Sequence, residues 1–69
     1  MEMSIQRKFG WEVARARRSA GMTQQTLARL AKTRQANISR LERGIQNPSV
    51  EFLERVAKSL GKKIRIKID

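Results

Sequence analysis

One stretch constrains the fold more than any other: residues 22–44, with the sequence MTQQTLARLAKTRQANISRLERG. Its first part places four apolar residues on or beside one helical face: Leu27, Ala28, Leu30 and Ala31. Lys32-Thr33-Arg34 interrupts this pattern, which resumes at Ile38 and Leu41, and Gly44 suits the left-handed position that follows a helix. The stretch therefore predicts a helix, a tight turn and a second helix.

The exposed positions of the second predicted helix carry side chains suited to nucleic acid. Apart from Ala36 they are polar or cationic: Arg34, Gln35, Asn37, Ser39, Arg40 and Arg43. An arginine can donate two hydrogen bonds to guanine, a glutamine can pair with adenine, and a small apolar side chain can contact a thymine methyl group. Other polar and cationic side chains can bind phosphates. We therefore interpret residues 22–44 as a DNA-binding helix-turn-helix.

The charge balance points to a polyanionic partner. The chain has 16 Lys and Arg against 6 Asp and Glu, a formal net charge of +10, which favours nucleic acid or an anionic membrane surface. A solvated basic surface is the alternative, but an isoelectric point near 11.7 exceeds the threshold typical of nucleic-acid-binding domains. No apolar run approaches the roughly 20 residues of a membrane span. We expect double-stranded DNA as the partner and no association with a membrane.

Size and composition restrict the chemistry. The 69 residues make one small domain with a thin core. The chain contains no Cys and no His, which excludes a disulfide framework and the usual zinc sites, so we expect no metal and no cofactor. It also lacks a glycine-rich phosphate loop, a carboxylate pair and a base to activate Ser or Thr, so we do not expect an enzyme. The N-terminus is too polar for a signal peptide, and we expect a cytoplasmic location.

Helical patterns also flank the central stretch. Over residues 5–20, one face carries Ile5, Phe9, Val13, Ala16 and Ala20. Over residues 50–60, apolar residues recur at Leu53, Val56, Ala57 and Leu60. Gly10 interrupts the first of these helices and allows either the close approach of another element or a break in the helix. Trp11 lies off the apolar face, where its ring would flank the core or a dimer contact.

The pattern changes after Gly61. In residues 62–69, Ile64, Ile66 and Ile68 alternate with cations, and β-branched residues with period two predict a strand. A single strand leaves its backbone hydrogen bonds unpaired, so we expect it to pair antiparallel with the same strand of a second copy, forming a homodimer. A disordered basic tail is the alternative.

Residues 9–61 resemble the phage-repressor helix-turn-helix domain of the XRE (Cro-like) family. The resemblance is carried by a set of short segments in a specific order: Phe9-Gly10, Arg17, Gly21-Met22-Thr23-Gln24, Leu27-Ala28, Ile38-Ser39-Arg40-Leu41-Glu42-Arg43-Gly44, Asn47-Pro48-Ser49 and Leu60-Gly61. It implies a mainly α fold, the compact four-helix lambda-repressor-like domain. The implied helices are 5–20, 24–31, about 34–42 and 50–60, which make a helical core over residues 5–61.

The resemblance also implies roles for individual residues. Four lie where relatives contact base edges: Arg34, Gln35, Ala36 and Arg40. Five lie where phosphate contacts occur: Thr23, Gln24, Asn37, Arg43 and Asn47. Gln24 would in addition brace the recognition helix. Arg17 and Glu42 match positions that form an ion pair between helices.

The sequence departs from the family pattern in three places. Lys32 stands where a turn glycine is usual, so a lysine must adopt a left-handed or distorted turn there. Arg34 stands where a capping Ser or Thr is usual, so Thr33 is expected to cap the recognition helix instead. Residues 62–69 replace a fifth helix with the predicted strand, and this ending resembles the HipB-like antitoxins, whose partner is a toxin protein.

These observations leave three hypotheses. The first is a dimeric repressor that binds a palindromic operator, and in the antitoxin version also represses its own type II toxin–antitoxin operon. The second is a protein-interaction module that mainly neutralises a toxin, with DNA binding secondary. The third is a nonspecific nucleic-acid or membrane-surface binder, which would leave the amides of Gln35 and Asn37 without a purpose.

Overall fold

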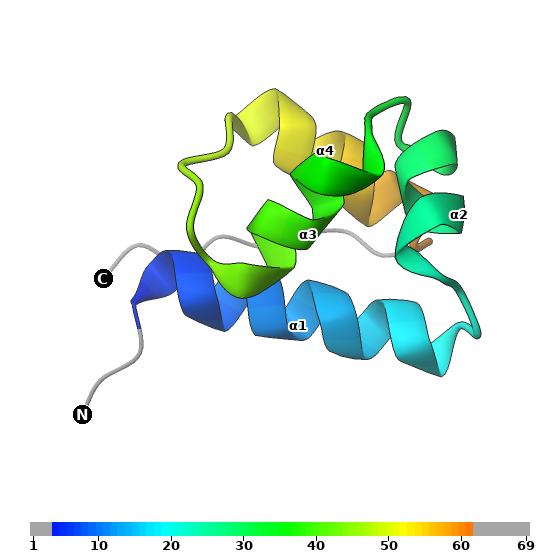
Figure 1. Cartoon of the computed structure of the whole chain (residues 1–69), viewed down its shortest axis with the longest axis horizontal. Coiled ribbons are helices and arrows are strands. Elements are labelled where there is room, and N and C mark those ends of the chain that lie inside the picture. Colours follow the sequence, from blue (N-terminus) through cyan, green and yellow to red (C-terminus); the bar gives the residue numbers. More distant parts are fainter. Residues whose placement is uncertain (1–3, 62–69) are drawn as a thin grey trace.

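A computed structural model describes residues 4–61 of the chain, which form four helices (Figure 1). The helices are α1 (Ile5–Ser19), α2 (Gln24–Leu30), α3 (Gln35–Arg43) and α4 (Val50–Ser59). The mainly α architecture is therefore the one that the sequence predicts, and each observed boundary lies within one residue of the expected one. The strand predicted over residues 62–69 lies outside the described residues.

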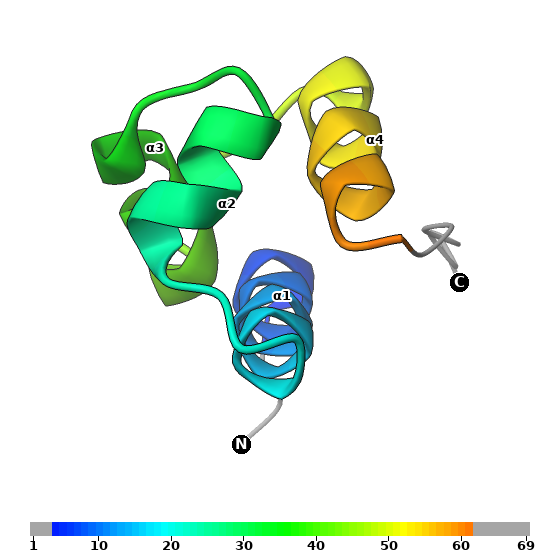
Figure 2. The same ribbon diagram turned by 90° about the vertical axis from the view of Figure 1, so that its right-hand side faces the viewer.

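The helices enclose one apolar core. α1 lies along one side of the molecule, and α3 packs against both α1 and α2 (Figure 1). Figure 2, which looks nearly along α1, shows α2 and α3 on one side and α4 on the other. Buried residues from all four helices meet between them: Val13, Leu27, Ala28, Ala31, Ile38, Leu41, Leu53 and Val56. Because α3 contributes Ile38 and Leu41 to this core, its opposite face is directed outward.

The prediction of which face of α1 is buried is partly wrong. The buried residues of the helix are Gly10, Val13, Ala14 and Arg17, whereas Ile5 is 61% exposed. Leu30, which was assigned to the inner face of α2, is likewise 50% exposed. In α1 the buried face is rotated because the helix meets α3 along Gly10 and Arg17, which an apolar periodicity does not include.

Trp11 is not among the apolar residues packed against the core, and its alternative role in a dimer contact stays a prediction. Its side chain is 53% exposed, and the Arg15 guanidinium lies over its ring, 5.5 Å from the ring centroid. This geometry is a cation–π contact on the outer face of α1.

Gly10 allows two backbones to touch. α1 continues through this residue without a break, so the break suggested by the sequence does not occur. A Cβ atom at Gly10 would lie 2.2 Å from the Leu41 carbonyl oxygen and 2.8 Å from that of Glu42. Both atoms belong to the backbone of α3, which cannot move aside as a flexible side chain could. The spacing of α1 and α3 therefore depends on the missing side chain.

We expect Gly10→Ala to destabilise the protein by about 1–3 kcal/mol, because the added methyl group forces the two helices apart. Helix propensity alone would act in the opposite direction, by about 1 kcal/mol. The free energy of unfolding can be measured by urea denaturation. Ser19→Ala, at an exposed position of the same helix, is the control and should change stability little. A stabilised Gly10→Ala variant would contradict the close contact.

Candidate nucleic-acid interface

The outward face of α3 gathers the residues that the sequence assigned to base recognition. Arg34 is the N-cap residue of the helix, and the other three lie in its first two turns: Gln35, Ala36 and Arg40. All four are exposed. Since Ile38 and Leu41 lie in the core, Ala36 and Arg40 project from the opposite, exposed side of the helix.

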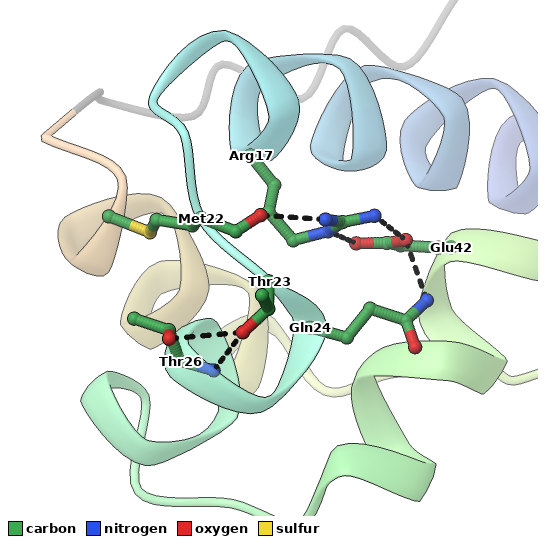
Figure 3. A network of polar contacts seen from close by, with 6 residues as sticks. All are labelled: Arg17, Met22, Thr23, Gln24, Thr26 and Glu42. Carbon is green, nitrogen blue, oxygen red and sulfur yellow. Dashed lines mark hydrogen bonds and ion pairs between the residues drawn. The ribbon is translucent and has the colours of Figure 1, made fainter.

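A buried ion pair joins α1 to α3 (Figure 3). Arg17 Nε donates to Glu42 Oε2 at 2.6 Å, and Arg17 Nη2 donates to Glu42 Oε1 at 3.1 Å. The two side chains are only 10% and 5% exposed. This two-point geometry fixes the orientation of both groups. It is the pair that the family resemblance implies.

Two further hydrogen bonds extend this ion pair into a network (Figure 3). Arg17 Nη1 donates to the Met22 carbonyl oxygen at 2.8 Å, and Gln24 Nε2 donates to Glu42 Oε1 at 2.9 Å. The network therefore connects α1, the turn after it, the start of α2 and the end of α3. The bond from Gln24 is the bracing contact that the resemblance implies. The Met22 carbonyl was not foreseen, because a backbone acceptor leaves no mark in the sequence.

Lys32 adopts the left-handed conformation expected for it. Its φ is +56°, and it follows the last turn of α2. The Lys32 N–H donates to the Arg29 carbonyl at 3.2 Å and the Thr33 N–H to the Ala28 carbonyl at 2.8 Å. These two bonds make a Schellman ending. The turn therefore keeps its hydrogen bonds while a lysine carries the backbone strain that a glycine would avoid.

The expectation that Thr33 caps α3 is wrong. Arg34 is the N-cap residue, with extended backbone and no side-chain cap bond. The Thr33 hydroxyl oxygen instead accepts a hydrogen bond from Asn37 Nδ2 at 2.9 Å. Asn37 is therefore only partly exposed, and its amide group helps to hold the turn between the two helices.

The residues assigned to phosphate contacts lie at the start of α2, within α3 and in the loop after α3. At the start of α2, the Thr23 hydroxyl oxygen accepts from the Thr26 N–H at 3.0 Å and so caps the helix. After the C-terminal end of α3, Asn47 Oδ1 accepts from Gln6 Nε2 at 2.6 Å, which ties the loop before α4 to α1. Arg43 is exposed in the last turn of α3. Polar and cationic groups therefore lie at the start of α2, in the last turn of α3 and in the loop that follows it.

Other kinds of site find little support within residues 4–61. In that range no group of His, Cys, Asp and Glu side chains could hold a metal ion. None of the four helices has both the length and the apolar character that a membrane crossing requires.

The sequence matches a known family, and the structure is similar to solved structures of regulators. A family model described as helix-turn-helix matches residues 13–66. The restriction-modification controller protein C.AhdI from Aeromonas hydrophila is 30% identical with a TM-score of 0.81, over 83% of this chain and 86% of that one. The clp gene regulator ClgR from C. glutamicum is 28% identical with a TM-score of 0.89, over 93% and 82%.

A third similar structure contains DNA. The controller protein C.Esp1396I, crystallised as a tetramer with its natural 35 base-pair operator, is 29% identical with a TM-score of 0.82, over 90% of this chain and 82% of that one. No curated protein sequence matches the chain significantly.

Removing one partner of the buried Arg17–Glu42 pair should lower the stability of the protein strongly. We expect Glu42→Ala to destabilise the protein by about 3–5 kcal/mol, because it leaves the Arg17 guanidinium buried without its carboxylate. Glu51→Ala is the matched control: it breaks the exposed Arg55–Glu51 pair and should cost less than about 0.5 kcal/mol. Urea denaturation measures both.

A second variant keeps the prediction testable if Glu42→Ala does not fold at all. The double substitution Arg17→Met, Glu42→Leu removes both charges together and should be more stable than Glu42→Ala alone. Equal losses for Glu42→Ala and Glu51→Ala would show that the buried pair does not hold α1 against α3.

Proposed function

The chain belongs to the helix-turn-helix family of the XRE type, and on this basis we propose that it regulates transcription by binding double-stranded DNA at a specific sequence. The observation that carries the proposal is the outward face of α3. It presents Gln35, Ala36 and Arg40 side by side, while its inner face is fixed in the core. A helix of this size fits the major groove, where each base pair displays a distinct pattern of donors and acceptors.

The side chains on this face suit distinct base edges. We assign Arg40 and Arg34 to guanine, because each can donate two parallel hydrogen bonds to the O6 and N7 atoms. Gln35 matches adenine, to which it can both donate and accept. Ala36 is small enough to contact a thymine methyl group. Such contacts would give sequence preference, which a basic surface alone would lack.

Phosphate contacts would hold this helix in register. We assign them to Thr23 and Gln24 on one flank of α3 and to Arg43 and Asn47 on the other, with Asn37 between them. The hydrogen bond from Gln24 to Glu42 supports this arrangement, because it couples the first flank to the recognition helix. A regulator that binds chromosomal DNA would also fit the expected cytoplasmic location.

We further propose that the chain acts as a homodimer on a palindromic operator. Two recognition helices roughly 34 Å apart would contact successive major grooves on one side of the duplex. The tetramer of the similar controller protein on its operator supports an oligomeric assembly. The alternating Ile64, Ile66 and Ile68 are the candidate contact between the copies.

An antitoxin role is the more specific form of the proposal, and the second candidate is a module whose main task is to neutralise a toxin. Both depend on the alternating isoleucines of residues 62–69, since such a strand could pair with a partner protein as well as with its own copy. Operator binding and partner binding can be separated experimentally through Arg40, which lies on the DNA-facing surface.

In vitro selection from a random duplex library tests the main proposal. With the full chain as bait, we expect enrichment of one palindromic sequence that the protein prefers over unrelated duplex. A library that shows no enrichment at moderate salt would favour the nonspecific binder instead.

Arg40→Ala should weaken binding to the selected duplex by about 1–3 kcal/mol and relax the preference at one base pair of each half-site. Fluorescence anisotropy with the selected duplex and with base-substituted duplexes measures both effects. Arg55→Ala, which removes the same charge from α4, is the control and should leave the preference unchanged. If Arg40→Ala keeps the original preference, Arg40 does not contact a base. Any partner protein captured by the full chain should still bind this variant.

Deleting residues 64–69 should convert the dimer to a monomer and weaken operator binding, because each copy loses its pairing strand. Sedimentation equilibrium at moderate salt measures the mass of both chains. A truncated chain that remains dimeric would contradict the strand pairing, whereas a full-length chain that is already monomeric would direct the search to a partner protein.

A further inference from the structure

The first turns of α1 reach the end of the recognition helix. Gly44, the C-cap residue of α3, has a φ of +70°. A Cβ atom at this position would lie 2.5 Å from Arg7 Cγ and 2.6 Å from Arg7 Cα. The stem of the Arg7 side chain therefore crosses Gly44 in direct contact, although the residue as a whole is exposed.

The position of Arg7 around α1 places it on the side of Gly10 that is turned away from Val13. Gly10 faces the backbone of α3, and Val13, about 60° to one side of Gly10, lies in the core. Arg7 lies about 60° to the other side. Figure 2 shows α3 and α4 on different sides of α1, and the contact with Gly44 places Arg7 beside the C-terminal end of α3.

Arg7 and Arg43 therefore lie together at one corner of the molecule, beside the end of α3, and make this corner cationic. Gly44 directly follows Arg43, which is exposed in the last turn of α3. The surface is hollowed beside it, between Gln6 and residues 44–47, and the Gln6–Asn47 hydrogen bond holds α1 against this loop. The ion pairs among residues 4–61 are Arg17–Glu42 and Arg55–Glu51. Neither involves Arg7 or Arg43, so both guanidinium groups can bind an anion.

We propose that Arg7 binds a backbone phosphate of the DNA, next to the phosphate assigned to Arg43. The inference rests on the proposed function and extends its interface from the helix-turn-helix onto the first turns of α1. A guanidinium is well suited to this contact, because its planar donors match two oxygens of one phosphate group. Since every nucleotide carries that phosphate, the contact adds affinity at any sequence and does not alter base preference.

The salt dependence of binding to unrelated DNA tests this proposal without knowledge of the operator. The probe is a fluorescent duplex of about 20 base pairs and arbitrary sequence. For such a duplex, the logarithm of the binding constant falls linearly with the logarithm of the salt concentration, with a slope of about −0.9 for each phosphate that the protein neutralises. Arg7→Gln should reduce that slope by about 1 and weaken binding roughly three- to tenfold. Arg7→Lys should retain most of the slope, because it keeps the charge.

Lys8→Gln is the matched control. It removes one positive charge from the adjacent exposed residue, which lies about 100° further around α1. It should change the slope much less than Arg7→Gln. Equal effects of the two variants would overturn the proposal, because they would mean that only net charge matters.

A purely structural role for Arg7 makes a different prediction. A cation near the C-terminus of α3 could stabilise the helix through its dipole. Arg7→Gln would then lower the melting temperature but leave the salt slope unchanged, and that pair of results would also overturn the phosphate contact.

Ethylation interference on the selected duplex locates the contact. Arg7→Gln should lose interference at one phosphate of each half-site, outside the recognised bases, with the base preference unchanged. If the wild-type chain selects no sequence at all, the proposed function fails. If it selects one and the Arg7 variant loses no phosphate, only the present inference fails.

Discussion

Arg17 carries a permanent positive charge into the contact between α1 and α3, where 8% of the residue is exposed. A guanidinium in such a place is tolerated only when its charge and its N–H groups are matched. Glu42 supplies the charge and two acceptor atoms, and the Met22 carbonyl supplies a third acceptor. Because these acceptors belong to different segments, satisfying one side chain fixes the relative positions of α1, α3 and the turn between α1 and α2. A buried pair of this kind specifies an arrangement more than it adds net stability.

Gly10 complements the ion pair on the same face of α1. The two residues are about two helical turns apart, so both face α3. The absence of a side chain at Gly10 sets how closely the helices approach, and Arg17 sets how they are aligned along their length. Apolar packing alone would permit small rotations and shifts, because dispersion and hydrophobic contacts are not directional. The combination of one close backbone contact and one directional pair removes that freedom.

The consequence for function is that contacts on the inner face of α3 fix the position of this helix. Its inner residues Ile38 and Leu41 lie in the core, and Glu42 is bound from both α1 and α2. The outward residues therefore need no internal partner to be positioned. Gln24, which is assigned to a phosphate contact, donates a hydrogen bond to Glu42. A displacement of α2 would therefore also displace the recognition helix. A rigid scaffold beneath adaptable side chains suits the reading of base edges, whose hydrogen-bond geometry is exacting.

The amino-acid sequence determined the four helices, the turn at Lys32 and the outward polar face of α3, because these depend on local propensity and on periodicity along the chain. Periodicity failed for α1, where a glycine and an arginine are buried while Ile5 is exposed. The cap expected from Thr33 is also absent, since the Thr33 hydroxyl oxygen accepts a hydrogen bond from Asn37 instead. Only the tertiary structure decided which face of α1 is buried, and it alone brought Arg7 to Gly44, because such contacts join residues far apart in sequence. The close approach of α1 to α3 and the hydrogen bonds of one buried charge are properties of the packed helices, which no single segment contains.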